Sequence, residues 1–146
     1  MNLISHYISG AEQKPSSTRT AAVYDPALGT ESGRVALADA KDIKAAIDSA
    51  KLAYPAWRDS SLAKRQQIIF KFRELLNERK PELAAIITAE HGKVLSDALG
   101  EITRGQEVVE FACGMPHLLK GEYSENASTN VDVYSTKQPL GVVGII

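Results

Sequence analysis

The sequence has little of three things that would define a special class: cysteine, net charge and long apolar runs. Cys113 is the only cysteine, so an internal disulfide and a disulfide-stapled secreted scaffold are excluded. The 17 basic and 18 acidic side chains leave a formal charge of −1, without the basic footprint of a nucleic-acid-binding protein. We therefore expect a protein of a reducing compartment with no nucleic-acid partner.

Membrane anchors and targeting peptides are also missing from the sequence. The longest uninterrupted apolar run covers residues 140–146, far below the ~20 residues that cross a bilayer. No basic residue precedes Lys14, the first arginine is Arg19, and no long apolar stretch follows the N-terminus. The N-terminus thus predicts neither a signal peptide nor a transit peptide, which favours a cytoplasmic protein without a membrane partner.

The length of 146 residues suits one domain whose core needs neither a disulfide nor a metal ion. The first 37 residues predict short strands, near 6–9 and 21–24, joined by turns into the edge of a β-meander. Apolar side chains then recur every three or four positions, which predicts amphipathic helices and an α/β fold.

Two helices are predicted between residues 39 and 80. Asp39 is a good cap for the first, and Pro55 should interrupt it. Ser60 or Ser61 can cap the second, which should end near residue 80 because a proline follows.

Two more helices should complete a set of four. One runs from Pro81 to about residue 91 and closes at Gly92, and the next covers about 96–117. The last helix contains three glycines, for which we expect a closely approaching backbone, the alternative being a helix broken into pieces: Gly100, Gly105 and Gly114.

The carboxyl-terminal part returns to strand patterns. Residues 122–129 are polar and predict a loop, while residues 131–136 alternate as a half-buried antiparallel strand does. Residues 140–146 carry no polar side chain, which predicts a strand buried on both faces in a parallel sheet. Such a strand needs neighbours from later crossover units, so we expect this chain to be a truncated part of a longer protein.

Cys113 is the first candidate for chemistry. Glu110 and His117 lie three and four positions away on the same predicted helix, a spacing that could gather metal ligands. Gly114 and Pro116 disturb that helix, so we interpret Cys113 as a core thiol and predict no metal site.

His6 and His91 are isolated in the sequence, which favours structural or surface roles for them. Gly141 and Gly144 do not form the dinucleotide-binding fingerprint.

Basic side chains provide the other candidates. Arg104 follows Glu101 by three positions, which predicts an intrahelical ion pair, but beside Gly105 its planar fork could instead hold a carboxylate substrate. Four further basic residues on the second helix predict a solvated face: Lys64, Arg65, Lys71 and Arg73.

As a set, the motifs resemble the aldehyde dehydrogenase superfamily over essentially the whole chain. The stretch 100–114, with 116–121 after it, is similar to the methylmalonate-semialdehyde dehydrogenase branch, whose members are CoA-acylating. Gly10 is followed by Ala11-Glu12 and lacks the tryptophan common there in relatives. The shared motifs are Tyr7-Ile8-Ser9-Gly10, Tyr24-Asp25-Pro26-Ala27-Leu28-Gly29, Trp57-Arg58, Glu90-His91-Gly92-Lys93, Gly100-Glu101 and Gln138-Pro139-Leu140-Gly141-Val142-Val143-Gly144.

The resemblance implies an NAD-dependent enzyme. In the family a cysteine thiolate attacks the aldehyde, the thiohemiacetal gives hydride to the nicotinamide, and in this branch the thioester passes its acyl group to CoA. Arg104 matches the arginine that holds the carboxylate of malonate or methylmalonate semialdehyde. The nucleophile, the oxyanion asparagine and the cofactor-contacting residues lie beyond the equivalent of Ile146, so no catalytic or cofactor-binding residue is predicted in this chain.

The resemblance also divides the chain. Residues 1–122 would be the N-terminal part of an NAD-binding domain, 123–138 a loop and oligomerisation strand, and 139–146 the first core strand of the nucleotide-binding sheet. The whole enzyme would be a homo-oligomer, a tetramer or a dimer, and this chain alone would be inactive. Two alternatives stay open: a fragment of a hydrolytic aldehyde dehydrogenase, or a short noncatalytic interaction module.

Overall fold

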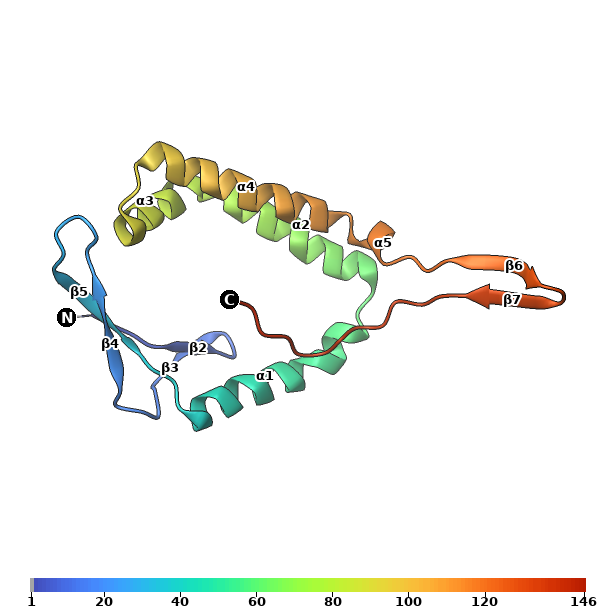
Figure 1. Ribbon diagram of the computed structural model, residues 1–146, viewed down its shortest axis with the longest axis horizontal. Helices are drawn as coiled ribbons and strands as arrows, with labels where there is room; N and C mark the ends of the chain where they lie inside the picture. The colour runs from blue at the N-terminus through green and yellow to red at the C-terminus, as the bar shows by residue number, and fades with distance from the viewer. Residues whose placement is uncertain (1) are drawn as a thin grey trace.

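A computed structural model describes residues 2–146, in which short strands are followed by helices and then by a hairpin (Figure 1). The elements are β1 (Asn2–Ile4), β2 (His6–Ile8), β3 (Ala11–Gln13), β4 (Thr20–Tyr24), β5 (Glu31–Ala36), α1 (Ala40–Arg58), α2 (Leu62–Glu78), α3 (Lys80–His91), α4 (Leu95–Cys113), α5 (Met115–Leu118), β6 (Tyr123–Ser128) and β7 (Val131–Tyr134).

The strands of the N-terminal region form two small sheets. β4 and β5 pair antiparallel, β1 joins the other edge of β5 in parallel, and β2 pairs with β3 as a separate hairpin. The strands expected near 6–9 and 21–24 are confirmed as β2 and β4. The expected meander is wrong, because β1 and β5, far apart in the sequence, are parallel neighbours.

Local capping explains where the first two helices begin. The Asp39 carboxylate accepts hydrogen bonds from the backbone of Lys41 and Asp42, while the Asp42 side chain accepts from the Asp39 backbone, which is a complete capping box. Ser61 caps α2. Pro55 does not interrupt α1, which continues to Arg58; a proline removes one backbone donor, and here only the last turn follows it.

The third helix closes as expected, but the fourth is shorter. Gly92 ends α3 in the left-handed conformation, with a φ of 82°, and its N–H donates to the carbonyl of Thr88. The helix predicted for 96–117 ends at Cys113, and the single turn of α5 follows it. Pro116 explains the shorter helix. Proline has no backbone N–H to donate within a continuous helix, and its ring would clash with the preceding turn.

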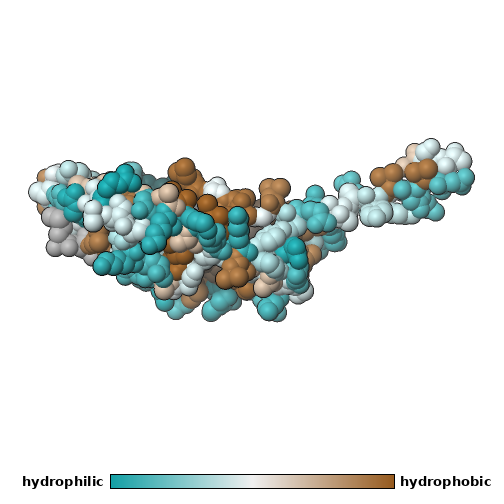
Figure 2. Space-filling model, turned by 90° about the horizontal axis from the view of Figure 1, so that it is seen from below, coloured by the Kyte–Doolittle hydropathy of each residue, from teal (hydrophilic) through white to brown (hydrophobic). Residues whose placement is uncertain are grey.

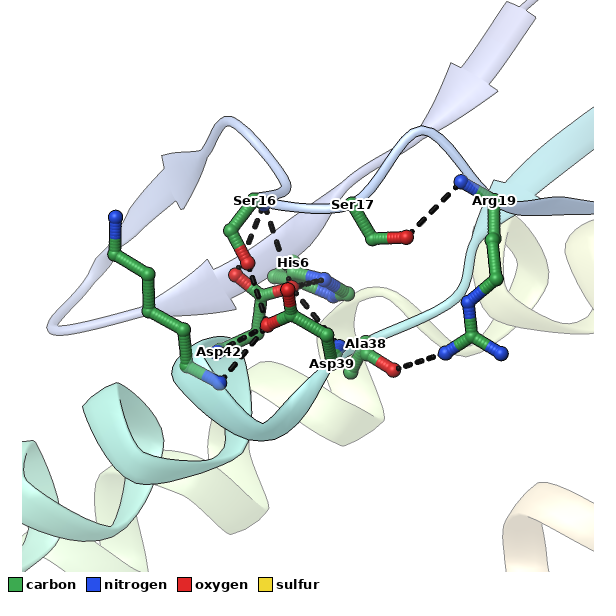
Figure 3. A network of polar contacts seen from close by, with 8 residues as sticks. His6, Ser16, Ser17, Arg19, Ala38, Asp39 and Asp42 are labelled. Carbon is green, nitrogen blue, oxygen red and sulfur yellow. Dashed lines mark hydrogen bonds and ion pairs between the residues drawn. The ribbon is translucent and has the colours of Figure 1, made fainter.

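A network of polar groups ties the N-terminal strands to the start of α1 (Figure 3). The Ser16 hydroxyl donates to Oδ1 of Asp39 over 2.6 Å, and the Ser16 N–H donates to Oδ1 of Asp42 over 3.0 Å. Nε2 of His6 in β2 lies 3.3 Å from Oδ2 of Asp42. The half-buried His6 therefore has the structural role expected for it.

The helices α2, α3 and α4 lie side by side as one layer, and α1 runs apart from them (Figure 1). The small core lies between α3 and α4 and consists of Ala84, Ala98 and Ile102, surrounded by Leu83, Ile87 and Leu99. The apolar stripe of α1 is partly exposed at Ile43 and Ile47.

The chain does not close a core of the size expected from its length. It exposes 11153 Å², whereas a compact monomer of 15.8 kDa exposes about 7,300 Å². The expectation of a self-sufficient core is therefore wrong. The helices present apolar faces, and hydrophobic side chains gather near the middle of the face seen in Figure 2.

β6 and β7 form an antiparallel hairpin that projects from the helices as an arm (Figures 1 and 2). The expected strand near 131–136 is confirmed as β7, but it is exposed on both faces instead of half-buried. The prediction of a loop at 122–129 is wrong, because residues 123–128 form β6. Both faces of β6 meet solvent, so its sequence has no alternation that could predict a strand.

Residues 139–146 have no regular structure; in Figure 1 they pass the C-terminal end of α1 and end between α1 and the layer formed by α2 and α4. The buried strand expected there is not formed: Leu140 is 94% exposed, and among residues 2–146 no segment pairs with this one. A strand is defined by hydrogen bonds to its neighbours, so an apolar run alone does not make one. In the part of the chain that the structure describes, no helix is long and apolar enough to span a bilayer.

Candidate functional site

Arg104 lies in the middle of α4, on the side facing away from α2 and α3. Ala98, Ile102 and Gln106 form the buried side of this helix, and Arg104 is half a turn away from Ile102. Its side chain is exposed. The packing of α4 therefore positions Arg104 as an outward-facing cation.

The ion pair expected between Glu101 and Arg104 is not formed. Oε2 of Glu101 instead accepts a hydrogen bond from Nζ of Lys93 over 2.7 Å, from the loop that precedes α4. This hydrogen bond and the charge of Lys93 hold the pKa of Glu101 below its usual value, and Arg104 adds only a smaller charge effect. Among residues 2–146, no carboxylate lies within 4.0 Å of the Arg104 guanidinium.

The surroundings of Arg104 combine open space with apolar surface. Gly100, Val108 and Phe111 lie one turn before, one turn after and two turns after it on the same stripe. Val108 and Phe111 are each 69% exposed. A Cβ added at Gly100 or Gly105 would meet no atom within 4 Å, so the close backbone expected at these two glycines is wrong.

The arrangement can hold a small carboxylate. A guanidinium presents two parallel N–H donors that match the two oxygens of a carboxylate. Because no acidic group competes for Arg104 in the described residues, its donors are available to a ligand.

On the buried side of α4, polar groups are engaged with one another. Oε1 of Glu110 accepts a hydrogen bond from Gln106 over 3.0 Å and a second from Nε of Arg73 over 2.8 Å. These bonds, the one from Gln106 first, hold the pKa of Glu110 below its usual value. Arg73 is thus an ion-paired residue that joins α2 to α4, and the prediction of a solvated face is wrong for it.

Cys113 has the packing role expected from its sequence position. Its side chain is buried, with 7% of the residue exposed, and Gln66 donates a hydrogen bond to its carbonyl oxygen. His117 is exposed beyond the helix break, and Glu110 is held by Arg73. Within residues 2–146 no three His, Cys, Asp or Glu side chains gather as a metal site. His91 is exposed at the end of α3.

Gly141 and Gly144 are placed outside any dinucleotide-binding turn. Gly141 and Gly144 lie in the irregular segment 139–146, and neither opens a helix, whereas a dinucleotide-binding turn joins a strand to a helix N-terminus. The sequence-based interpretation of these two glycines therefore agrees with their place in the structure.

Two groups of residues escaped the sequence reasoning. The first is the network of Ser16, Asp39 and Asp42, of which only the cap was predicted. The second is a pocket lined by Arg58, Arg65 and Lys137, whose residues are far apart in the sequence. Basic residues without nearby acidic partners, at 64–65 and at 137, were the only available signal.

Comparisons with known proteins give a consistent result. Residues 13–146 match the aldehyde dehydrogenase family. A malonate-semialdehyde dehydrogenase of Pseudomonas aeruginosa is 45% identical over 98% of this chain and 29% of its own length. A mitochondrial acylating methylmalonate-semialdehyde dehydrogenase of Arabidopsis thaliana is 42% identical over 95% of this chain and 23% of its own.

A solved structure agrees with these relatives. A protein of Sinorhizobium meliloti, crystallised with NAD and assigned to the methylmalonate-semialdehyde dehydrogenases, superposes with a TM-score of 0.91 and 42% identity. The match covers 97% of this chain and 29% of that one. The chain thus spans less than a third of the length of each of these three proteins.

Proposed function

The chain belongs to the aldehyde dehydrogenase family, and from this premise we propose that it is part of an NAD-dependent enzyme that oxidises malonate or methylmalonate semialdehyde. Relatives that carry these substrates in their names are 42–45% identical over nearly the whole chain, which supports the substrate class. NAD is supported by the Sinorhizobium meliloti structure. The cytoplasmic location stays a prediction from the sequence.

Arg104 is the observation that carries this proposal. Both semialdehydes have a carboxylate at one end and an aldehyde at the other. An outward-facing guanidinium without an acidic partner can bind the carboxylate and leave the aldehyde free to reach a nucleophile. Arg104 would therefore select substrates and orient them, without taking part in bond making.

The nucleophile of the proposed enzyme would come from the remainder of the protein. Cys113 is buried and packs α4 against the neighbouring helices, so it does not offer a thiolate to the stripe that contains Arg104. We assign no catalytic residue to residues 2–146 and expect this chain alone to be inactive with NAD, CoA and the semialdehyde.

The acyl acceptor distinguishes two versions of this proposal. The name of the Arabidopsis thaliana relative includes the word acylating, which supports CoA as the co-substrate. A hydrolytic enzyme would release a free acid instead. Product analysis by mass spectrometry in the presence of CoA separates them. The acylating enzyme should accumulate an acyl-CoA, whereas the hydrolytic enzyme should release the free acid.

The hairpin β6–β7 supports a homo-oligomer, either a dimer or a tetramer. Its strands are exposed along their whole length, and Val131, Val133 and Tyr134 present apolar surface to solvent. An exposed strand edge is a template for pairing with another chain. We propose that this hairpin contributes to subunit contacts of the whole enzyme.

Replacing Arg104 in the whole enzyme tests the substrate assignment. Arg104→Leu should lower kcat/KM for malonate semialdehyde by roughly 10- to 150-fold, the worth of a hydrogen bond to a charged group. For propanal, which has no carboxylate, kcat/KM should stay within about twofold. Arg79→Leu, an exposed arginine between α2 and α3, is the matched control. Equal losses for both aldehydes would show that Arg104 has only a structural role.

A further inference from the structure

A second basic site lies where the end of α1, the start of α2 and the segment 137–139 come together. It is a pocket of about 260 Å³ lined by Arg58, Arg65, Leu119, Lys137, Gln138 and Pro139. Three of these side chains are cations and one is an amide, and none is acidic. It uses different elements from the stripe of α4 that contains Arg104.

The charges of this pocket are not balanced by the described protein. Nε and Nη2 of Arg58 donate to the two carboxylate oxygens of Asp59 over 2.7 and 3.1 Å, which neutralises one positive charge. Arg65 and Lys137 form no ion pair within residues 2–146. Two positive charges therefore remain over one small pocket.

Arg65 also has a hydrogen-bond donor that is buried and unsatisfied. Its Nε atom is shielded from solvent and has no acceptor in the part of the chain that the structure describes. A buried donor without an acceptor costs free energy. Because Nε has no solvent-accessible surface, an acceptor in the pocket would reach it only after the Arg65 side chain turns toward the ligand. Leu119 and Pro139 form the apolar part of the wall, where a charge pair is less screened by water than at an open surface.

We propose that this pocket binds an oxyanion of the phosphate class. A phosphate has oxygen acceptors for the Arg65 fork, the Lys137 ammonium and the Gln138 amide, and its two negative charges balance the two unpaired cations. The pocket is smaller than the roughly 300–1,000 Å³ of sites for drug-sized ligands, so it accommodates a phosphate group and not a whole cofactor. The site does not depend on the proposed aldehyde chemistry.

NMR titration of the complete chain tests this site directly. Sodium phosphate replaces sodium chloride at constant ionic strength, and the Arg65 Nε–H signal is followed. The signal should shift saturably with phosphate and stay unchanged in chloride. Glycerol phosphate is titrated in a second arm: saturation by both compounds assigns the site to the phosphate group itself, and saturation by glycerol phosphate alone assigns it to a phosphorylated metabolite. Both results support the proposal.

Matched variants separate a built site from general charge effects. Lys137→Gln should weaken phosphate binding roughly tenfold, as expected for loss of one charge-assisted contact. Lys64 is an exposed residue of the same helix as Arg65 but lies outside the pocket. Lys64→Gln should therefore leave the phosphate affinity within about twofold of its original value. Lys137 lies in an irregular exposed segment, so this variant does not threaten folding. The proposal is overturned by an absence of saturation in both arms, by acetate binding as tightly as phosphate, or by equal weakening in the two variants.

Discussion

Nζ of Lys93 lies 2.7 Å from Oε2 of Glu101, and this contact leaves Arg104, three residues further along α4, without an acidic partner. The residue that most favours a carboxylate-binding role therefore depends on a lysine outside its helix. If Lys93 did not hold Glu101, the ordinary pairing at a spacing of three residues would bring Glu101 to Arg104.

The first prediction concerns this competition. Lys93→Met should raise the pKa of Glu101, because the hydrogen bond from Lys93 is the largest cause of the lowering, although a new pairing with Arg104 would still hold it partly below its usual value. Arg104→Leu should raise it less. The pKa is measured by carbon-13 NMR of the Glu101 carboxyl group, with Lys51→Met as the control for removal of one exposed positive charge. A larger change in Arg104→Leu than in Lys93→Met would contradict the contact geometry.

A second prediction concerns acid stability. The hydrogen bond from the Ser16 hydroxyl is the main reason why the pKa of Asp39 lies below its usual value. Burial raises the pKa of Asp42, but hydrogen bonds from Ser16 and from the Asp39 backbone outweigh it, so this pKa is lowered as well. A carboxyl whose pKa is lowered by folding contributes stability above its unfolded pKa of about 4 and loses it as the pH falls through the folded value.

Ser16→Ala should therefore move the midpoint of acid unfolding to higher pH and raise the pKa of Asp39. Circular dichroism between pH 2 and pH 6 measures the midpoint. Ser17→Ala is the matched control, since the Ser17 hydroxyl accepts a bond from the Arg19 backbone and does not contact Asp39. The role of Ser16 is refuted if the two variants unfold at the same pH.

A third prediction compares two glycines. Gly92→Ala should lower the free energy of unfolding by about 1–2 kcal/mol, the cost of a left-handed conformation for a residue with a Cβ. The added Cβ would also lie 3.1 Å from Cγ of Pro26. Gly100→Ala, in the interior of α4 with open space around it, should raise the free energy of unfolding by up to about 1 kcal/mol. Urea unfolding measures both, and effects of the same sign would be inconsistent with the structure.

A fourth prediction concerns the hairpin. Val133→Asp in the whole enzyme should shift the oligomer toward smaller species, because a charge on an exposed apolar strand opposes association. Light scattering after size-exclusion chromatography measures the mass. Thr129→Asp adds the same charge between β6 and β7 and should leave the mass unchanged. An unchanged mass in Val133→Asp would remove the hairpin from the proposed interface.

The helices could be predicted from sequence because their signals are local. Asp39, Ser61 and Gly92 act through backbone groups within a few residues, so the cap positions hold whatever surrounds them. The strands depend on distant partners. The parallel contact between β1 and β5 joins residues about thirty positions apart, which no local pattern encodes.

The candidate site could be predicted only in part. The spacing of Glu101 and Arg104 correctly placed both on one helix, but the decisive contact comes from Lys93, eight residues before Glu101. The pocket lined by Arg65 and Lys137 depends on how the segment 137–139 returns to α2, so it follows from the tertiary arrangement alone. The charge pattern of a single helix cannot distinguish a solvated cation from one that meets cations of other segments at a pocket.

The large exposed surface of the chain has a calorimetric consequence. A compact domain of this length releases apolar surface on melting and gains about 2 kcal/mol/K in heat capacity. Here much of that surface is already hydrated in the native state, at α1 and along residues 140–146. We therefore expect the chain alone to melt in a broad transition with a small heat-capacity increment. Association with a partner that covers these faces should be accompanied by a large negative change in heat capacity.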